Sequence, residues 1–146
     1  MRGLVLAIAS SALLASSAAV AAPEEDTARQ AIIAGRFQPF DAMTSQGWSA
    51  AFPFPFFRNA AAGESDSVSL VLKPGAYRVV VLCNCDKIDV ALKTPANTVP
   101  DPDRRNDQGA MYSLDVPATG EFEISTTLRA CQEARCDFAV KAYRKN

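Results

Sequence analysis

The 146-residue sequence contains no histidine and no surplus of either sign of charge. Without histidine, the chain can form neither a Ser-His-Asp or Cys-His catalytic group nor a metal site with imidazole ligands. Its 15 basic and 16 acidic residues give a net charge of −1, which provides no overall electrostatic footprint for nucleic acid or for an anionic membrane. The length suits one domain, and the composition is that of an ordinary globular protein.

A long hydrophobic run occurs only at the start of the sequence. Arg2 gives a positive start, residues 4–20 are uncharged, and Ala19-Val20-Ala21 forms a small-x-small cleavage site ahead of the acidic segment 23–26. This pattern predicts a secretory signal peptide over residues 1–21. The alternative is a membrane anchor, but serines and alanines dilute the run below the roughly 20 strongly apolar residues that a span needs. We therefore expect a periplasmic or secreted protein that has no membrane span after cleavage.

The sequence contains four cysteines, and all of them follow the predicted cleavage site: Cys83, Cys85, Cys131 and Cys136. In an exported protein an even number of cysteines predicts disulfides, whereas in the cytosol the same spacing would indicate a metal or redox site. A crossed bridge would close about 49 residues and stabilise the fold by roughly 4 kcal/mol, against about 2 kcal/mol for a six-residue loop. Chain geometry favours local pairing, because residues 132–135 have the length of a hairpin loop and Asn84 can supply a bend. Local pairing is favoured, and the crossed connectivities stay open.

The segment that follows the signal peptide, residues 22–66, predicts a short helix and then an aromatic zone. Residues 24–34 begin with acidic side chains, which suit the N-terminus of a helix. The apolar side of this helix carries Ala28, Ala31 and Ile32. We expect the helix to pack on the domain, because a free helix of this length is unstable.

Five rings of the aromatic zone form a candidate binding surface: Trp48, Phe52, Phe54, Phe56 and Phe57. Prolines alternate with rings over residues 52–56, and because proline lacks the N–H of a strand ladder, this stretch predicts an edge strand or a polyproline-like segment. A contiguous apolar patch would mark a binding site for a glycan or a peptide. The alternative interpretation is that the rings cover an open end or an exposed edge of the fold.

From Ser67 onward, apolar residues alternate with polar ones, which is the period of half-buried strands. Six strands are predicted, over residues 67–72, 76–83, 88–92, 112–116, 121–129 and 138–142. Strands at this spacing favour an antiparallel β-sandwich or a small barrel. The predicted fold class is therefore mainly β, with the β domain over residues 67–146 and a short helix before it.

Carboxylates in two neighbouring segments suggest a calcium site, because calcium binds six to eight oxygen ligands. The candidate ligands are Asp86, Asp89, Asp101, Asp103 and Asp107. Arg104 and Arg105 lie in the same loop and would neutralise it, and local turns would also account for these aspartates. We expect no other cofactor.

Residues 67–146 resemble the bacterial pre-peptidase C-terminal-type domains of exported proteins. The resemblance rests on the Gly-x-Tyr turn of residues 73–77, the cysteine-bearing loop and strand of residues 83–92, the Thr-Gly-x-Phe turn of residues 119–122 and the late cysteine pair. It implies a jelly-roll-like β-sandwich that is usually non-catalytic, sometimes depends on calcium, and binds or escorts other molecules.

These observations predict an exported, non-catalytic binding or accessory protein of the cell envelope, with an envelope protein or a glycan as its partner. The alternatives are an inhibitor or escort of a specific envelope enzyme, acting through the loop of residues 94–108, and a calcium-stabilised structural module. We expect no enzymatic activity: Glu121 and Glu123 share one strand face with no predicted pocket, and Cys83 and Cys85 lack a histidine base.

Overall fold

The computed structural model describes residues 23–146, with the side chains of residues 27–102 and 107–146. The predicted signal peptide lies outside the described residues. The helical elements are α1 (Pro23–Arg36), α2 (Gln38–Asp41) and the 3-10 helix η1 (Ala42–Gln46). The strands are β1 (Trp48–Ala50), β2 (Phe56–Ala61), β3 (Ser65–Leu72), β4 (Gly75–Cys83), β5 (Lys87–Lys93), β6 (Asp103–Asn106), β7 (Gly109–Val116), β8 (Gly120–Ala130) and β9 (Arg135–Lys145). In this part of the chain, no helix is long and apolar enough to cross a membrane.

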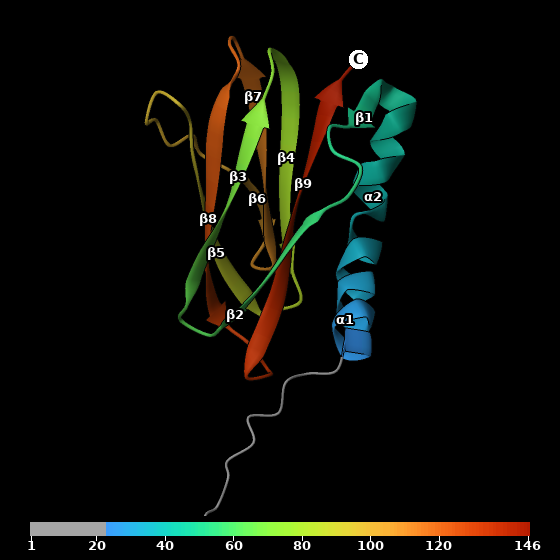
Figure 1. The fold of residues 1–146 in the computed structure, drawn as a ribbon, viewed down its shortest axis with the longest axis vertical. Helices are drawn as coiled ribbons and strands as arrows, with labels where there is room; N and C mark the ends of the chain where they lie inside the picture. The colour runs from blue at the N-terminus through green and yellow to red at the C-terminus, as the bar shows by residue number, and fades with distance from the viewer. Residues whose placement is uncertain (1–22) are drawn as a thin grey trace, which may run out of the picture.

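The strands form two antiparallel sheets that pack face to face (Figure 1). The larger sheet has the order β1-β9-β4-β7-β6, and β2 also pairs with β9. The smaller sheet has the order β3-β8-β5. This arrangement confirms the predicted antiparallel β-sandwich with a short N-terminal helix, and the six predicted strands correspond to β3, β4, β5, β7, β8 and β9.

The alternating pattern of the sequence builds the core between the sheets. On β3, Val68, Leu70 and Leu72 are buried, whereas Ser69 and Val71, which lie between them, are exposed. They join one cluster with inward residues of the larger sheet such as Val81 and Phe138, which are fully buried. Burying an aliphatic or phenyl side chain of this size contributes about 1.5–3 kcal/mol, so this core dominates the stability of the sandwich.

A helical layer covers part of the outer face of the larger sheet (Figure 1). The cluster beneath it contains residues of the helical segments and of β1, β4, β7 and β9: Ile33, Phe37, Met43, Trp48, Val80, Met111, Ala139 and Tyr143. Residues 79–81 of β4 are therefore buried on both faces of the sheet, which explains why this strand is continuously apolar in sequence.

The expected apolar side of the helix is wrong, although the helix itself is confirmed. Ala28, Ala31 and Ile32 are exposed, with 60% of Ile32 accessible to solvent. Ile33 is fully buried instead, together with Phe37 just beyond the end of α1. These two residues are four apart, so they lie one above the other and meet the sheet as a pair.

Three short strands were not among the six predicted. β1 and β2 both pair with β9 and together make one edge of the larger sheet, so the strands of the sandwich begin before residue 67. Residues 51–55 separate them and include Pro53 and Pro55, which cannot donate to a ladder. β6 lies inside the predicted loop of residues 94–108, which is a correction: Asp103 and Asn106 pair with β7 at the other edge.

Both disulfides are local. Cys83 pairs with Cys85 across a Cα–Cα distance of 5.2 Å, and Cys131 pairs with Cys136 across 6.0 Å. The local connectivity favoured by the sequence is thus confirmed. Both bridges lie at the same end of the sandwich, since Asn84 and Asp137 exchange two hydrogen bonds between the two cysteine segments.

Candidate functional site

The five candidate rings do not form one exposed surface. Trp48 is only 8% exposed and belongs to the cluster beneath the helical layer. Phe52 and Phe56 meet edge to face, with centroids 5.3 Å apart, and pack against the core between the sheets. Phe57 packs against the outer cluster, and Phe54 is 76% exposed. Four of the rings therefore engage the fold along the β1–β2 edge, and one projects into solvent.

The described aspartates of the candidate calcium site do not gather. Asp86 accepts a hydrogen bond from Gln132, and Asp89 forms an ion pair with Arg129. Asp101 and Asp107 are exposed, and the side chain of Asp103 lies outside the described residues, as do those of Arg104 and Arg105. Among the side chains that are described, no three His, Cys, Asp or Glu groups lie close enough together to hold a metal ion.

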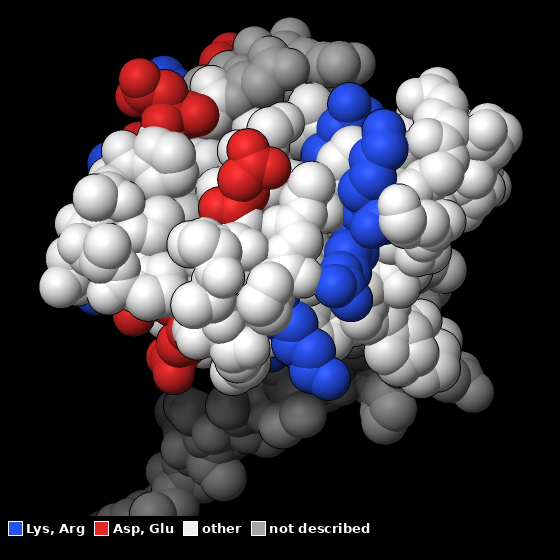
Figure 2. Space-filling view, turned by 90° about the horizontal axis from the view of Figure 1, so that it is seen from above, with Lys and Arg blue, Asp and Glu red and all other residues white. Residues whose placement is uncertain are grey.

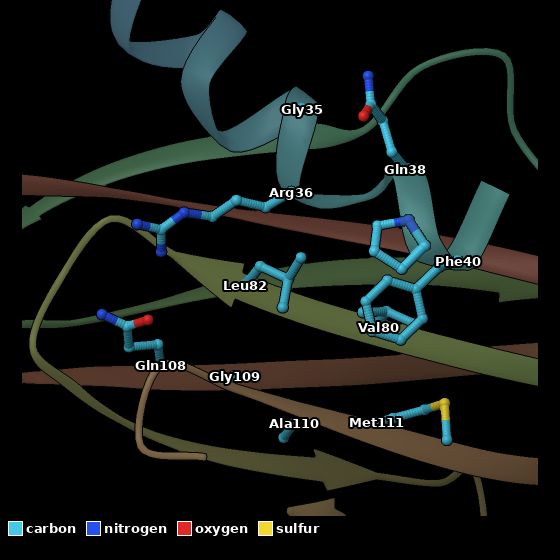
Figure 3. Close-up of a pocket in the computed structure, with 11 residues that line it drawn as sticks. Gly35, Arg36, Gln38, Phe40, Val80, Leu82, Gln108, Gly109, Ala110 and Met111 are labelled. Atoms are coloured by element: carbon cyan, nitrogen blue, oxygen red, sulfur yellow. The ribbon is translucent and has the colours of Figure 1, made fainter. Parts of the chain in front are cut away.

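A hollow lined by described residues lies on the outer face of the larger sheet, beside the helical layer (Figure 3). We call it the outer groove, and it has a volume of about 800 Å³. Its walls are the end of α1 together with α2, and its floor is formed by β4 and β7. The lining residues are Gly35, Arg36, Gln38, Pro39, Phe40, Val80, Leu82, Gln108, Gly109, Ala110 and Met111.

The groove exists because the helical layer is narrower than the sheet beneath it. α1 packs mainly on β9, and Phe40 of α2 lies beside Val80 and Met111 without filling the space above them, so the outer faces of β4 and β7 are partly uncovered. At the floor, Gly109 allows β7 to approach β4, since a Cβ at this position would lie 2.6 Å from the carbonyl oxygen of Val81. The volume is within the range of small-molecule sites, roughly 300–1,000 Å³.

Apolar side chains face one another across the groove. In Figure 3, Leu82 rises from β4 between Arg36 and Phe40, while Met111 lies below Phe40 on β7. Gln38 points away from the strands. A smaller pocket of about 250 Å³ adjoins the groove on the side toward the start of β4, since Pro39, Phe40 and Met111 line both.

Each of these two adjoining hollows is lined by one arginine. Arg36 crosses one end and donates a hydrogen bond to the carbonyl oxygen of Cys83. Arg78 lines the other end, where its guanidinium stacks on Trp48 at 4.5 Å from the ring centroid and lies 2.9 Å from Sδ of Met43. Of the described residues that line the two pockets, only these two are charged.

A polar contact fixes α2 on the sheet beside the groove. The carboxylate of Asp41 accepts a 2.8 Å hydrogen bond from the hydroxyl of Tyr143 and forms an ion pair with Lys141. Burial raises the pKa of the Tyr143 phenol far above its ordinary value, and the hydrogen bond and the negative charge of Asp41 raise it further. The phenol therefore keeps its proton and its bond to Asp41 throughout the neutral range.

Replacing Tyr143 with Phe should lower the free energy of unfolding by about 1 kcal/mol at neutral pH, the net contribution of one hydrogen bond. Because the folded-state pKa is raised, the phenol's contribution is complete below about pH 10, the unfolded value, and declines as the pH rises above it. Urea unfolding of both proteins at about pH 8 and about pH 11 measures this. The difference in stability should narrow at the higher pH, and a constant difference would contradict the assignment.

The sequence prediction missed the groove residues. Phe40 and Arg36 were placed in no site, Leu82 was interpreted as a strand residue, and Met111 lay just before a predicted strand. One signal was present: a strand that is apolar at successive positions, as β4 is from Val79 onward, is typical of burial on both faces and hence of a covering layer.

No protein-family model matches the chain, and no curated protein matches it either. The resemblance of residues 67–146 to pre-peptidase C-terminal-type domains therefore stays a prediction. The fold and the groove are the features on which a function must be argued.

Proposed function

We propose that the protein is an exported, non-catalytic binding protein of the cell envelope, and that the outer groove is its ligand site. The observation that carries this proposal is a preformed hollow with an apolar lining and few polar groups, which is the usual character of a small-molecule site. The signal-peptide pattern and the two disulfides support export, since such bridges persist in oxidising compartments.

The lining also favours one kind of ligand over another. Leu82, Phe40 and Met111 offer hydrocarbon surface, which suits a ligand with an apolar body better than a glycan rich in hydroxyl groups. The exposed ring of Phe54 stands alone among the five aromatic candidates, and one ring offers a far smaller apolar area than a groove.

A neutral dye that fluoresces in apolar surroundings, N-phenyl-1-naphthylamine, tests the groove directly. Gly35 lines the groove with no atom within 4 Å of a Cβ placed there, so the position accepts a side chain, and Gly35→Trp is designed to occupy the space of the groove. We expect saturable dye binding by the natural protein and at least about tenfold weaker binding by Gly35→Trp. Gly35→Ala is the matched control: it should bind normally and, because glycine disfavours helices, melt no lower.

A second variant, on β4, tests the groove without changing the sequence of α1. Leu82→Gln makes the centre of the groove polar while it keeps the half-buried position on β4. Like Gly35→Trp, it should weaken dye binding. Dye binding that is absent from the natural protein, or unchanged in both variants, would contradict the proposal.

The alternative role, inhibition or escort of an envelope enzyme, has one observation in its favour. Val99 is 63% exposed in the loop after β5, which projects from the sandwich on the side away from α1 (yellow in Figure 1). Capture of an envelope enzyme that persists in Gly35→Trp and is lost in Val99→Ser would support this role over binding in the groove.

A further inference from the structure

We propose that the ligand of the outer groove is an anionic amphiphile, whose alkyl chain lies along β4 and whose headgroup meets Arg78. This inference rests on the proposed function, since it names the class of ligand for the same groove. It is argued from the charges at the ends of the hollow, their surroundings and the length of the apolar surface between them.

The charges of the hollow have one sign. Arg36 and Arg78 are the only charged residues among the described lining of the two pockets. The ion pairs between described side chains involve other arginines or the lysines Lys93 and Lys141, so neither guanidinium forms an ion pair with a described carboxylate. An anionic group on the ligand would therefore be attracted at either end, and a cationic group would be repelled.

The end that carries Arg78 is the more positive of the two. Lys145 lies 5.4 Å from the centroid of the Trp48 ring on which Arg78 also stacks. Arg144 also lies at this end of the sheet, but over the ring of Tyr77, which belongs to the core between the sheets and so lies on the face opposite to Arg78. Figure 2 shows Lys and Arg side chains in a continuous row across this end of the sandwich, with the acidic residues in view grouped to one side.

At the other end, Arg36 already has a hydrogen-bond partner within the fold, because it donates to the carbonyl oxygen of Cys83. Arg78 instead contacts a ring face and a thioether, which leave most of its five N–H donors unused. A guanidinium held in one orientation by an aromatic ring is well suited to a bidentate bond with a carboxylate or a phosphate.

The apolar surface between the two arginines has the dimensions of an alkyl chain. Arg78 and Leu82 are four residues apart on β4, which corresponds to roughly 13 Å along a strand. Phe40 and Met111 flank this stretch and belong to both pockets. A single alkyl chain would follow the strand and contact hydrocarbon along its whole length.

Displacement of N-phenyl-1-naphthylamine by three probes with the same chain tests this inference: dodecanoate, dodecanol and dodecyltrimethylammonium. Dodecyl phosphate is added to compare a second anionic headgroup. We expect both anionic probes to bind at least about tenfold more tightly than dodecanol, the factor that one charge-assisted hydrogen bond supplies. The cationic probe should bind most weakly.

The variants locate the headgroup. In Arg78→Gln the anionic advantage should disappear while the affinity for dodecanol stays the same, which also shows that the groove is still folded. In Arg36→Gln and in Arg129→Gln, a control on the outer face of the smaller sheet, the advantage should persist.

Each other outcome overturns a stated part of the account. Equal affinity for dodecanoate and dodecanol would refute the anionic ligand and leave the groove as a binding site, whereas a failure of the neutral dye to bind would refute the proposed function itself. Loss of the advantage in Arg36→Gln would refute the position of the headgroup. Displacement of the dye by an acidic, leucine-containing peptide at lower concentration than by dodecanoate would refute the class of ligand.

Discussion

Replacing Phe138 with Ala is expected to lower the free energy of unfolding by about 4 kcal/mol, the cost of deleting a buried ring and leaving a cavity. Phe138 is fully buried on β9, and this strand pairs with β4 on one side and with β1 and β2 on the other. Its ring lies in the cluster between the two sheets, so its removal weakens the packing of one sheet on the other. Denaturant unfolding followed by far-ultraviolet circular dichroism measures the effect.

Phe54→Ala provides the matched control, because it deletes the same ring from a position that is 76% exposed. This variant should change the stability by less than about 0.5 kcal/mol. Similar losses from the two variants would contradict the arrangement in which Phe138 is core and Phe54 is solvent-exposed.

Replacing Arg29 with Ala should cost about 3 kcal/mol, the lower end of the range for breaking a buried ion pair, because it leaves a carboxylate buried without its cationic partner. Nε of Arg29, on α1, lies 3.0 Å from Oδ2 of Asp137 at the start of β9, and Asp137 is only 6% exposed. The other carboxylate oxygen accepts a 2.6 Å hydrogen bond from Asn59 on β2, which stabilises the charge but does not neutralise it. The pair therefore joins α1 to the sheet whose outer face it covers.

Arg129→Ala is the control for this second prediction. Arg129 pairs with Asp89 on the outer face of the smaller sheet, where both side chains are more than two-fifths exposed, and such surface pairs contribute about 0–1 kcal/mol. A loss from Arg29→Ala no larger than that from Arg129→Ala would show that α1 is not held by a buried charge. Since α1 forms one wall of the outer groove, Arg29→Ala should also weaken binding of the neutral dye.

The strand pattern could be predicted because burial within the sandwich follows a period of two. Val68, Leu70 and Leu72 are buried in the fold, and the residues that alternate with them in sequence, Ser67, Ser69 and Val71, are exposed. The local disulfides were also predictable, since they depend on the few residues between the paired cysteines. The strand pattern and the local disulfides both depend on residues that are close together in sequence.

The groove could not be predicted in the same way, because its residues come from segments far apart in sequence. Phe40 and Met111 become neighbours only when the helical layer lies on β4 and β7, and the uncovered strip of sheet depends on where α2 ends. The prediction of which face of α1 is buried was wrong for a related reason. Ile32 and Ile33 are equally apolar, and only the orientation that α1 adopts on β9 decides that Ile33 is the buried one.

The aromatic zone shows the limit of composition as a guide to binding surfaces. Phe52 and Phe56 are conspicuous in sequence, yet they pack against the core beside β9. Proline interrupts the edge between β1 and β2, and rings on either side of the interruption cover the core there. In contrast, Arg78 attracts no attention in a strand of valines, although its position at the end of the hollow gives the site its charge.

The most direct test of the account is a titration of the isotopically labelled mature protein with dodecanoate, followed by amide chemical-shift changes. The account predicts saturable shifts that centre on Phe40, Leu82 and Met111 and extend to Arg78, with the outer face of the smaller sheet unaffected. Saturable shifts that centre instead on Phe54, or the absence of any saturable shift, would contradict the claim that the outer groove is the binding site.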